Sequence, residues 1–266
     1  MGGGSTNRIQ FAHSYDNIIS VENLLAAWKE FKCGKTNKCD VQEFQYSLMD
    51  NILALHRELK ERTYKHGPYH AFKISDPKPR DIHKATVRDR LVHHAMYRQL
   101  YPFFDRAFIA DSYSCRRGKG THRAMNRFRA FAYKIVDRYK QNCWVLKCDI
   151  RKFFASIDQK ILLEIVSQYI PDERIRSLIA EVVGSFCSRC RIHSKYATAQ
   201  TKCMRKGLPL GNLTSQLLVN VYMNEFDQFV RHTLKAKYYV RYADDFIFLS
   251  HDKRRLESLL PLSKDF

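Results

Sequence analysis

The four residues 242–245, Tyr-Ala-Asp-Asp, constrain the fold of this chain more than any other feature. The segments on either side, 237–241 and 246–250, are rich in aromatic and β-branched residues, which favour strands. The sequence therefore predicts a β-hairpin with Asp244 and Asp245 at its tight turn. Two adjacent carboxylates repel each other and are costly to hold together unless a cation shares them. Since paired carboxylates suit Mg²⁺ in sites that also bind phosphates, the hairpin predicts a phosphoryl-transfer metal site, with an ordinary solvated hairpin as the alternative.

Positive charge is spread along the whole chain. Lys and Arg number 46 against 27 Asp and Glu, which gives a formal net charge of +19. Such a field favours a polyanion, because phosphate groups supply affinity that does not depend on sequence. We therefore expect nucleic acid as the partner, with general solubility charge as the alternative. We find no signal peptide and no apolar run of about 18 residues, so no membrane partner is expected and the chain is expected in the cytoplasm.

Helical and strand patterns alternate irregularly, which predicts an α+β fold with a small antiparallel sheet. A capping-box pattern from Asp40 to Glu43 precedes apolar residues at helical spacing and predicts a long helix over about 41–62. A strand pattern over 144–150 contains an acid, Asp149, near its end. The other expected elements are helices near 21–31, 87–100 and 121–140, helices after Ser156 and Pro171, short strands at 70–74 and 80–83, and a long helix after the loop 207–212.

Three of these segments are predicted to form one site: the strand that carries Asp149, the glycine-containing loop 207–211 and the acidic hairpin. If the strand of Asp149 pairs beside the hairpin, three carboxylates meet at one edge of the sheet. Two Mg²⁺ ions roughly 3.5–4 Å apart could then activate an attacking 3′-hydroxyl and steady a departing pyrophosphate. Three unrelated surface acids are the alternative interpretation.

Two motifs resemble the catalytic motifs of reverse transcriptases. Residues 149–154, Asp-Ile-Arg-Lys-Phe-Phe, are similar to the first motif, and residues 242–245 to the second. The resemblance covers roughly residues 60 to 255. It implies an RNA-directed DNA polymerase, a two-metal nucleotidyltransferase that uses Mg²⁺ with Mn²⁺ as a possible substitute. Its partners would be template RNA, a DNA primer and deoxynucleoside triphosphates, in a prokaryotic or phage-encoded system.

The stretch 206–216 resembles the enzymes of diversity-generating retroelements, as do 76–82 and 88–94. Many other reverse transcriptases have Gln at the position of Leu210 and Pro at that of Gln216. The resemblance therefore implies error-prone copying, with a small basic accessory protein as a possible partner. Two alternatives stay open: another prokaryotic reverse transcriptase (defence-associated, retron or group II intron type), and a non-catalytic RNA-binding scaffold, which three intact aspartates argue against.

The resemblance also implies a right-hand polymerase architecture of fingers and palm, with the small antiparallel palm sheet packed on helices. The chain ends soon after the second catalytic motif, so the thumb is expected to be absent and the activity of this chain alone stays an open question. The implied parts are a flexible N-terminus at 1–17, interleaved fingers at 18–90 and 160–206, and an incomplete palm at 91–159 and 207–266.

Individual roles follow from the resemblance. Phe154 would stack beneath the sugar of the incoming nucleotide and exclude a 2′-hydroxyl. Lys78 and Arg80 would reach the triphosphate, while Leu210 would pack on the nucleotide without a hydrogen bond. The complete implied site has catalytic Asp149, Asp244 and Asp245; a metal site of these three with Ile150; nucleotide-binding Lys78, Arg80, Arg151, Phe154, Leu210, Gly211 and Gln216; and template or primer contacts from Arg116, Arg117, Lys119, Gly207 and Tyr242.

The spacing of cysteines offers a second candidate metal site. Cys187, Cys190, His193 and Cys203 offer four zinc-ligand side chains. The short gap before His193 and the longer one before Cys203 are atypical of zinc sites, so ordinary reduced residues are the favoured interpretation.

Overall fold

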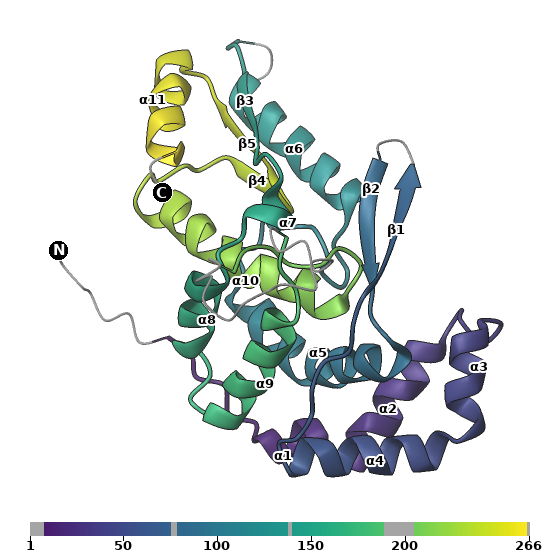
Figure 1. Cartoon of the computed structure of the whole chain (residues 1–266). Helices are drawn as coiled ribbons and strands as arrows, with labels where there is room; N and C mark the ends of the chain where they lie inside the picture. The colour runs from purple at the N-terminus through teal and green to yellow at the C-terminus, as the bar shows by residue number, and fades with distance from the viewer. Residues whose placement is uncertain (1–7, 76–78, 138–139, 189–204, 265–266) are drawn as a thin grey trace, which may run out of the picture. The chain divides into compact units, whose positions relative to one another are not determined.

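The structure, a computed structural model, describes residues 8–75, 79–137, 140–188 and 205–264. The chain divides into two compact units, and the path through its elements can be followed by colour in Figure 1. The first unit consists of Met1–Phe103 and Phe154–Leu218, and the second of Phe104–Phe153 and Val219–Phe266. Each unit is therefore built from two separate stretches of sequence.

The first unit is mainly helical. Helices α1 and α2 pack on each other and on α4, while α8 packs on α9. Apolar side chains at helical spacing cause this packing, because Ile52, Leu55 and Leu59 form the buried stripe of α4. The bounds of these helices are α1 Tyr15–Ile19, α2 Val21–Lys32, α3 Cys39–Tyr46, α4 Leu48–Lys60, α7 Phe153–Ser156 at the unit boundary, α8 Gln159–Ser167 and α9 Glu173–Gly184.

The predicted long helix over 41–62 and its capping box are wrong. The structure has two helices there, because Ser47 leaves helical geometry at φ −114° and ψ 44°. Asp40 lies inside the first turn of α3, and the N-cap residue Lys38 makes no side-chain cap bond. The Asp40 carboxylate instead lies 2.7 Å from Lys84 Nζ and 2.6 Å from Arg90 Nη2. Two cations from distant segments bind this carboxylate, so it does not cap the helix.

The predicted strands near 70 and 80 are confirmed as an antiparallel pair, β1 (His70–Ser75) and β2 (Pro79–Lys84). Helix α5, Val87–Ala107, follows and runs beyond the predicted end at residue 100. Helix α10, Leu213–His232, begins after the loop 207–212, as predicted. Within the described residues, no helix is both long enough and apolar enough to span a membrane.

The second unit contains a three-stranded antiparallel sheet, which confirms the predicted hairpin and its pairing with the strand of Asp149. The strands are β3 (Trp144–Asp149), β4 (Tyr239–Tyr242) and β5 (Asp245–Ser250), in the order β3-β5-β4. Two helices pack on the sheet: α6 (Thr121–Val136) on β4 and β5, and α11 (Lys253–Lys264) on β3 and β5 (Figure 1). The predicted helix over 121–140 ends early, at Val136, because its C-cap residue Asp137 is left-handed with φ 38°.

Candidate active site

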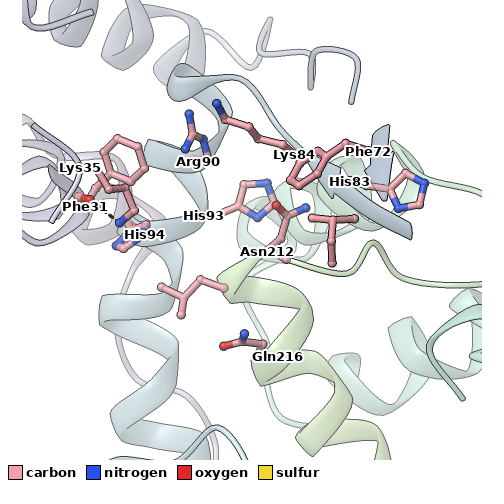
Figure 2. A pocket seen from close by; sticks show the side chains of 13 residues that line it. Phe31, Lys35, Phe72, His83, Lys84, Arg90, His93, His94, Asn212 and Gln216 are labelled. Carbon is pink, nitrogen blue, oxygen red and sulfur yellow. Dashed lines mark hydrogen bonds between the residues drawn. The ribbon is translucent and has the colours of Figure 1, made fainter. Parts of the chain in front are cut away.

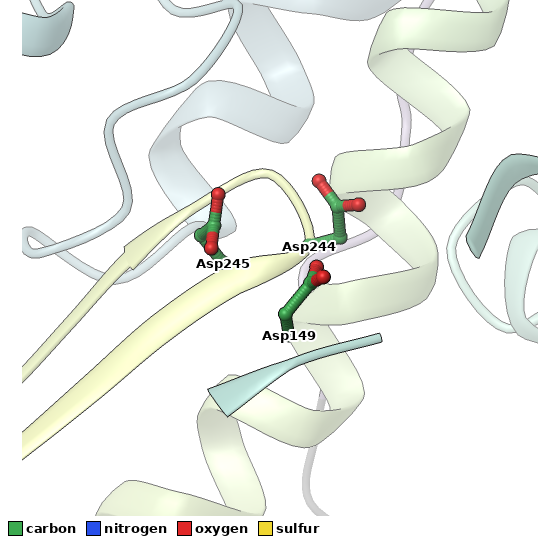
Figure 3. A group of neighbouring side chains, drawn as sticks. All are labelled: Asp149, Asp244 and Asp245. Atoms are coloured by element: carbon green, nitrogen blue, oxygen red, sulfur yellow. The ribbon is translucent and has the colours of Figure 1, made fainter. Parts of the chain in front are cut away.

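Three aspartates meet at one end of the sheet in the second unit. Asp149 is the last residue of β3, Asp244 lies in the hairpin turn, and Asp245 is the first residue of β5. The antiparallel register places Asp149 directly opposite Asp245. One ligand oxygen from each of the three lies within 4.8 Å of the others. Figure 3 shows the three side chains side by side on the hairpin and the neighbouring strand. The predicted convergence of the carboxylates is therefore present, and we call this cluster the acid triad.

The hairpin turn that carries Asp244 has an unusual backbone. Ala243 adopts a left-handed conformation with φ 57°, which costs a residue with a Cβ about 1–2 kcal/mol. Asp245 lies just past the turn, in register with Tyr242, and not in the turn as predicted. The side chains of Asp244 and Asp245 therefore point in different directions, while their carboxylate oxygens stay within 4.8 Å of each other.

The acid triad has the donor set of a site for divalent cations. Asp149 and Asp245 are exposed and Asp244 is half-buried. Lys147 Nζ lies 3.5 Å from Asp245 Oδ1, but these side chains are 71% and 50% exposed, and such surface pairs contribute only about 0–1 kcal/mol. Crowded carboxylate oxygens are hard ligands that suit Mg²⁺, so the residues present fit a divalent ion.

The other residues predicted for the metal or nucleotide in this unit lie beside the acid triad in sequence. Ile150 is half-buried and Arg151 is exposed, both directly after β3. Tyr242 is exposed at the end of β4, where its hydroxyl accepts a hydrogen bond from Thr121 Oγ1 at 3.2 Å. The ring of Tyr242 is thus held at the end of the sheet that also carries the acids.

The predicted template contacts of the basic loop differ in their availability. Arg116 is occupied within the unit, since its guanidinium binds Asp105 at 2.7 Å and donates to backbone carbonyls. Lys119 donates to the Ala110 carbonyl at 2.7 Å. Arg117 is exposed. A positive charge in the sequence does not reveal such internal use, because the acceptors are mostly backbone carbonyls.

The loop 207–211 in the first unit depends on its glycines. Gly207 has φ 94°, and a Cβ there would come within 2.8 Å of the Ser188 side chain. The N–H after it, on Leu208, donates to the Phe154 carbonyl at 2.8 Å, which ties the loop to α7. The Leu210 carbonyl accepts a hydrogen bond from the His83 N–H at 3.1 Å. The loop is therefore held against β2 through backbone hydrogen bonds, and Gly207 allows its close approach to Ser188.

The other residues predicted for nucleotide binding or for zinc differ in their exposure and surroundings. Arg80 is exposed on β2, and Phe154 is half-buried. Gly211 has φ 108° and a neighbour, Ile82 Cγ2, within 3.2 Å of where its Cβ would be. Lys78 lies outside the described residues, as do Cys190, His193 and Cys203 of the candidate zinc site.

A pocket of about 430 Å³ lies in the first unit, and Figure 2 shows the side chains around it. Gly211 and Gln216, two of the predicted nucleotide-binding residues, are part of its wall. Most of the others were not predicted from the sequence, because they come from separate segments. The lining residues are Phe31, Lys35, Phe72, Ile82, His83, Lys84, Arg90, His93, His94, Gly211, Asn212, Leu213 and Gln216.

The pocket wall contains neutral histidines. His93 is buried, with its Nδ1 2.5 Å from Thr214 Oγ1 and its Nε2 3.0 Å from His66 Nε2. Burial lowers the pKa of His93 to about 3, and burial with the nearby Lys35 lowers the pKa of His94 to about 4. Both rings are therefore uncharged at neutral pH. The cations of the pocket are its lysines and Arg90.

Three buried polar atoms of the pocket residues lack a hydrogen-bond partner within the described chain. They are Nδ1 of His83, Nδ1 of His94 and Nδ2 of Asn212. Buried polar groups usually have partners, so these atoms require water or a polar ligand to satisfy them. The signal was absent from the sequence, because each atom lacks a partner only once the fold is formed.

Comparisons with known proteins agree with this geometry. The family model described as reverse transcriptase (RNA-dependent DNA polymerase) matches residues 72–266. The chain is 26% identical over 157 residues to Protein YkfC of Escherichia coli, covering 59% of this chain and 38% of that protein. It is 25% identical over 193 residues to the Group II intron-encoded protein LtrA of Lactococcus lactis subsp. cremoris, covering 71% of this chain and 29% of that protein.

A solved structure shares the fold. A chain of the partial Cas6-RT-Cas1--Cas2 complex matches with a TM-score of 0.52 and 21% identity, covering 94% of this chain and 41% of that chain. This chain therefore spans less than half the length of these curated relatives and of this structural neighbour.

Proposed function

Because this chain belongs to the reverse transcriptase family, we propose that it performs template-directed DNA synthesis on an RNA template by two-metal nucleotidyl transfer. The single observation that carries the proposal is the acid triad, whose ligand oxygens lie within 4.8 Å of one another. The matched family model includes all three aspartates, since it covers residues 72–266. In this proposal the second unit with its sheet is the palm, and much of the first unit is the fingers.

Asp149, Asp244 and Asp245 would hold the divalent ions, with Ile150 beside them. Bound Mg²⁺, or Mn²⁺ in its place, would supply Lewis-acid activation of the primer 3′-hydroxyl and neutralise charge on the departing pyrophosphate. The chain's own contribution is position: the antiparallel register and the strained turn present the oxygens before any ligand arrives. Positioning of this kind reduces the entropy cost of the reaction.

The remaining roles stay proposals about the nucleotide and the template. Arg80 and Lys78 would bind the triphosphate, with Arg151 in support, since a guanidinium offers a bidentate fork and an ammonium a point charge. Phe154 would exclude the 2′-hydroxyl of a ribonucleotide. The pocket of the first unit, with its cations and unsatisfied polar atoms, supports binding of the template–primer nucleic acid or a nucleotide.

The finer assignment that we propose is an error-prone enzyme of a diversity-generating retroelement. It is supported by residues 206–216, in which Leu210 replaces a hydrogen-bonding Gln and Gln216 replaces Pro. The small basic accessory protein belongs to this assignment. The similarity to the intron-encoded protein and to the Cas-complex chain favours a second candidate, a group II intron-type or Cas-associated reverse transcriptase.

Primer extension tests the main proposal. A DNA primer annealed to an RNA template is incubated with deoxynucleotides and Mg²⁺, and extension is compared for the wild type and Asp149→Asn. We expect extension by the wild type alone, while both proteins bind the duplex. Binding without extension by the wild type would favour the RNA-binding scaffold.

Leu210→Gln tests the finer assignment. An apolar side chain gives a mispaired nucleotide nearly the same contact as a correct one, whereas one hydrogen bond is worth about 1 kcal/mol. We therefore expect fewer misincorporations, mainly opposite template adenine, when products of both versions are sequenced. Equal error spectra would remove the diversity-generating mechanism and leave the reverse transcriptase proposal in place.

A further inference from the structure

Arg241, next to the acidic hairpin tetrapeptide in sequence, is a fully buried arginine whose donors are all used. A guanidinium has five N–H donors, and Arg241 makes five side-chain hydrogen bonds. Two of them form a fork on Asp227, with Nε 2.8 Å from Oδ1 and Nη2 2.7 Å from Oδ2. Both side chains of this ion pair are 0% exposed.

The partners of Arg241 come from several segments of the second unit. Nη2 also donates to Ser112 Oγ at 3.0 Å, and Nη1 donates to Asn220 Oδ1 at 3.2 Å. Asp227 accepts one more bond, from the Tyr239 hydroxyl at 2.8 Å. The backbone of Arg241 is held as well, through its N–H to the Asp111 carbonyl at 2.9 Å. A buried charge with this many satisfied bonds has a fixed orientation.

The remaining bond reaches the turn of the acid triad. Nη1 of Arg241 donates to the Ala243 carbonyl at 3.0 Å. This carbonyl belongs to the peptide that links left-handed Ala243 to Asp244. The orientation of that peptide determines the direction in which the Asp244 side chain leaves the backbone. The link therefore runs from a rigid buried ion pair to one ligand of the acid triad.

We propose that Arg241, fixed by Asp227, is a positioning residue that holds the strained turn so that Asp244 faces Asp149. Two forces oppose this arrangement: the repulsion of crowded carboxylates and the cost of the left-handed residue. Asp227 neutralises the guanidinium, so Arg241 acts through the geometry of the turn and not through its charge. The inference rests on the proposed function only where it gives Asp244 the role of a ligand for the catalytic metal ions.

Binding of Mn²⁺ alone, followed by electron paramagnetic resonance, measures the positioning without any catalysis. The binding that is lost in Asp149→Asn defines the acid-triad site. We expect Arg241→Lys to weaken binding at this site by about tenfold, because a Lys ammonium cannot keep both the fork and the turn contact. Asp227→Asn removes one charge of the fork and is expected to give a similar loss.

Tyr239→Phe is the matched control. It removes a hydrogen bond from the same Asp227 carboxylate and leaves the bond from Arg241 to Ala243 in place. It should lower the melting temperature while the Mn²⁺ affinity stays within about twofold of the wild type. A purely structural role for Arg241 would make its variant behave like Tyr239→Phe.

Asn220→Ala keeps the test open if Arg241→Lys does not fold. It removes one of the two acceptors that orient Nη1, the nitrogen that donates to the Ala243 carbonyl. We therefore expect a loss of Mn²⁺ affinity of about threefold, while the buried ion pair stays intact. Folded Arg241 or Asn220 variants with wild-type Mn²⁺ affinity would overturn the inference. Normal Mn²⁺ binding by a wild type that never extends a primer would instead overturn the proposed function and leave the positioning intact.

Discussion

The acid triad of the second unit and the pocket of the first unit concentrate polar groups of opposite character. The triad crowds carboxylate acceptors within 4.8 Å, and Asp244 lies in a turn whose Ala243 carbonyl accepts a hydrogen bond from the buried Arg241. The pocket gathers Lys35, Lys84 and Arg90 with three buried polar atoms that lack partners. The first arrangement is complementary to cations and the second to an anionic ligand with polar edges, such as a nucleic acid. In the proposed function, the first region would hold the divalent ions and the second would bind nucleic acid.

The largest effect is expected at the acid triad. Asp244→Asn should reduce nucleotide addition by about a thousandfold, as removal of a transition-state-stabilising group does. It should leave the melting temperature unchanged or higher, because one source of carboxylate repulsion disappears. Asp227→Asn should instead cost about 3–5 kcal/mol of unfolding free energy, since it disturbs a buried ion pair. Calorimetry and primer extension on both variants check this contrast, and a triad variant that loses stability would contradict it.

A smaller effect is expected for the selection of deoxynucleotides over ribonucleotides, which we assign to Phe154 in the first unit. Phe154→Val removes the ring that we assign to exclusion of the 2′-hydroxyl. Incorporation of ribonucleotides relative to deoxynucleotides should rise about tenfold or more, within the range that a pocket of changed size can discriminate. Steady-state incorporation of matched nucleotide pairs measures the ratio. An unchanged ratio would make Phe154 a packing residue only.

The pocket itself can be tested in both directions. Lys84→Gln removes a cation, whereas Asp40→Asn frees Lys84 and Arg90 from their shared carboxylate. We expect the first change to weaken binding of an RNA–DNA duplex and to reduce the salt dependence by about 0.7–0.9 decades per tenfold salt, the value of one phosphate contact. The second change should strengthen binding several-fold at low salt. Fluorescence anisotropy over a salt series measures both. If both variants gave the same binding curves as the wild type, the nucleic acid would bind outside this pocket.

A further effect concerns stability below neutral pH. The folded pKa values of His93 and His94, about 3 and 4, lie below their ordinary value of 6.5. Above pH 6.5 these rings are neutral in both folded and unfolded chains. As the pH falls below 6.5, the unfolded chain takes up protons that the folded chain does not. The unfolding free energy should therefore fall, by at most about 1.4 kcal/mol per pH unit for each histidine. Urea unfolding from pH 7 to 5 measures the slope, which His93→Gln should reduce.

Features that depend only on neighbouring residues were predictable from the sequence. The strand patterns around residues 242–245 predict the hairpin, and the acid of the 144–150 segment suggests its partner. The antiparallel register then brings Asp149 opposite Asp245. Each step uses side-chain patterns a few residues long, and such patterns determine strand pairing when one face is buried.

Features that depend on distant residues were not predictable. Asp40 has the local pattern of a capping box, yet Lys84 and Arg90 bind its carboxylate. The buried His93 has its partner Thr214 at a distance of 121 residues along the chain. The fork of Arg241 on Asp227 crosses from a strand to a helix. Nothing in the local sequence marks such pairs, because each forms only after the elements have packed.

Iron-directed cleavage tests most directly whether the acid triad binds the catalytic divalent ions. Fe²⁺ replaces Mg²⁺, and ascorbate with peroxide generates hydroxyl radicals that cut the backbone near the bound metal. We predict cuts near residue 149 and near residues 244–245, suppressed by added Mg²⁺ and lost in Asp149→Asn. Cleavage elsewhere with none at these two positions would contradict the account.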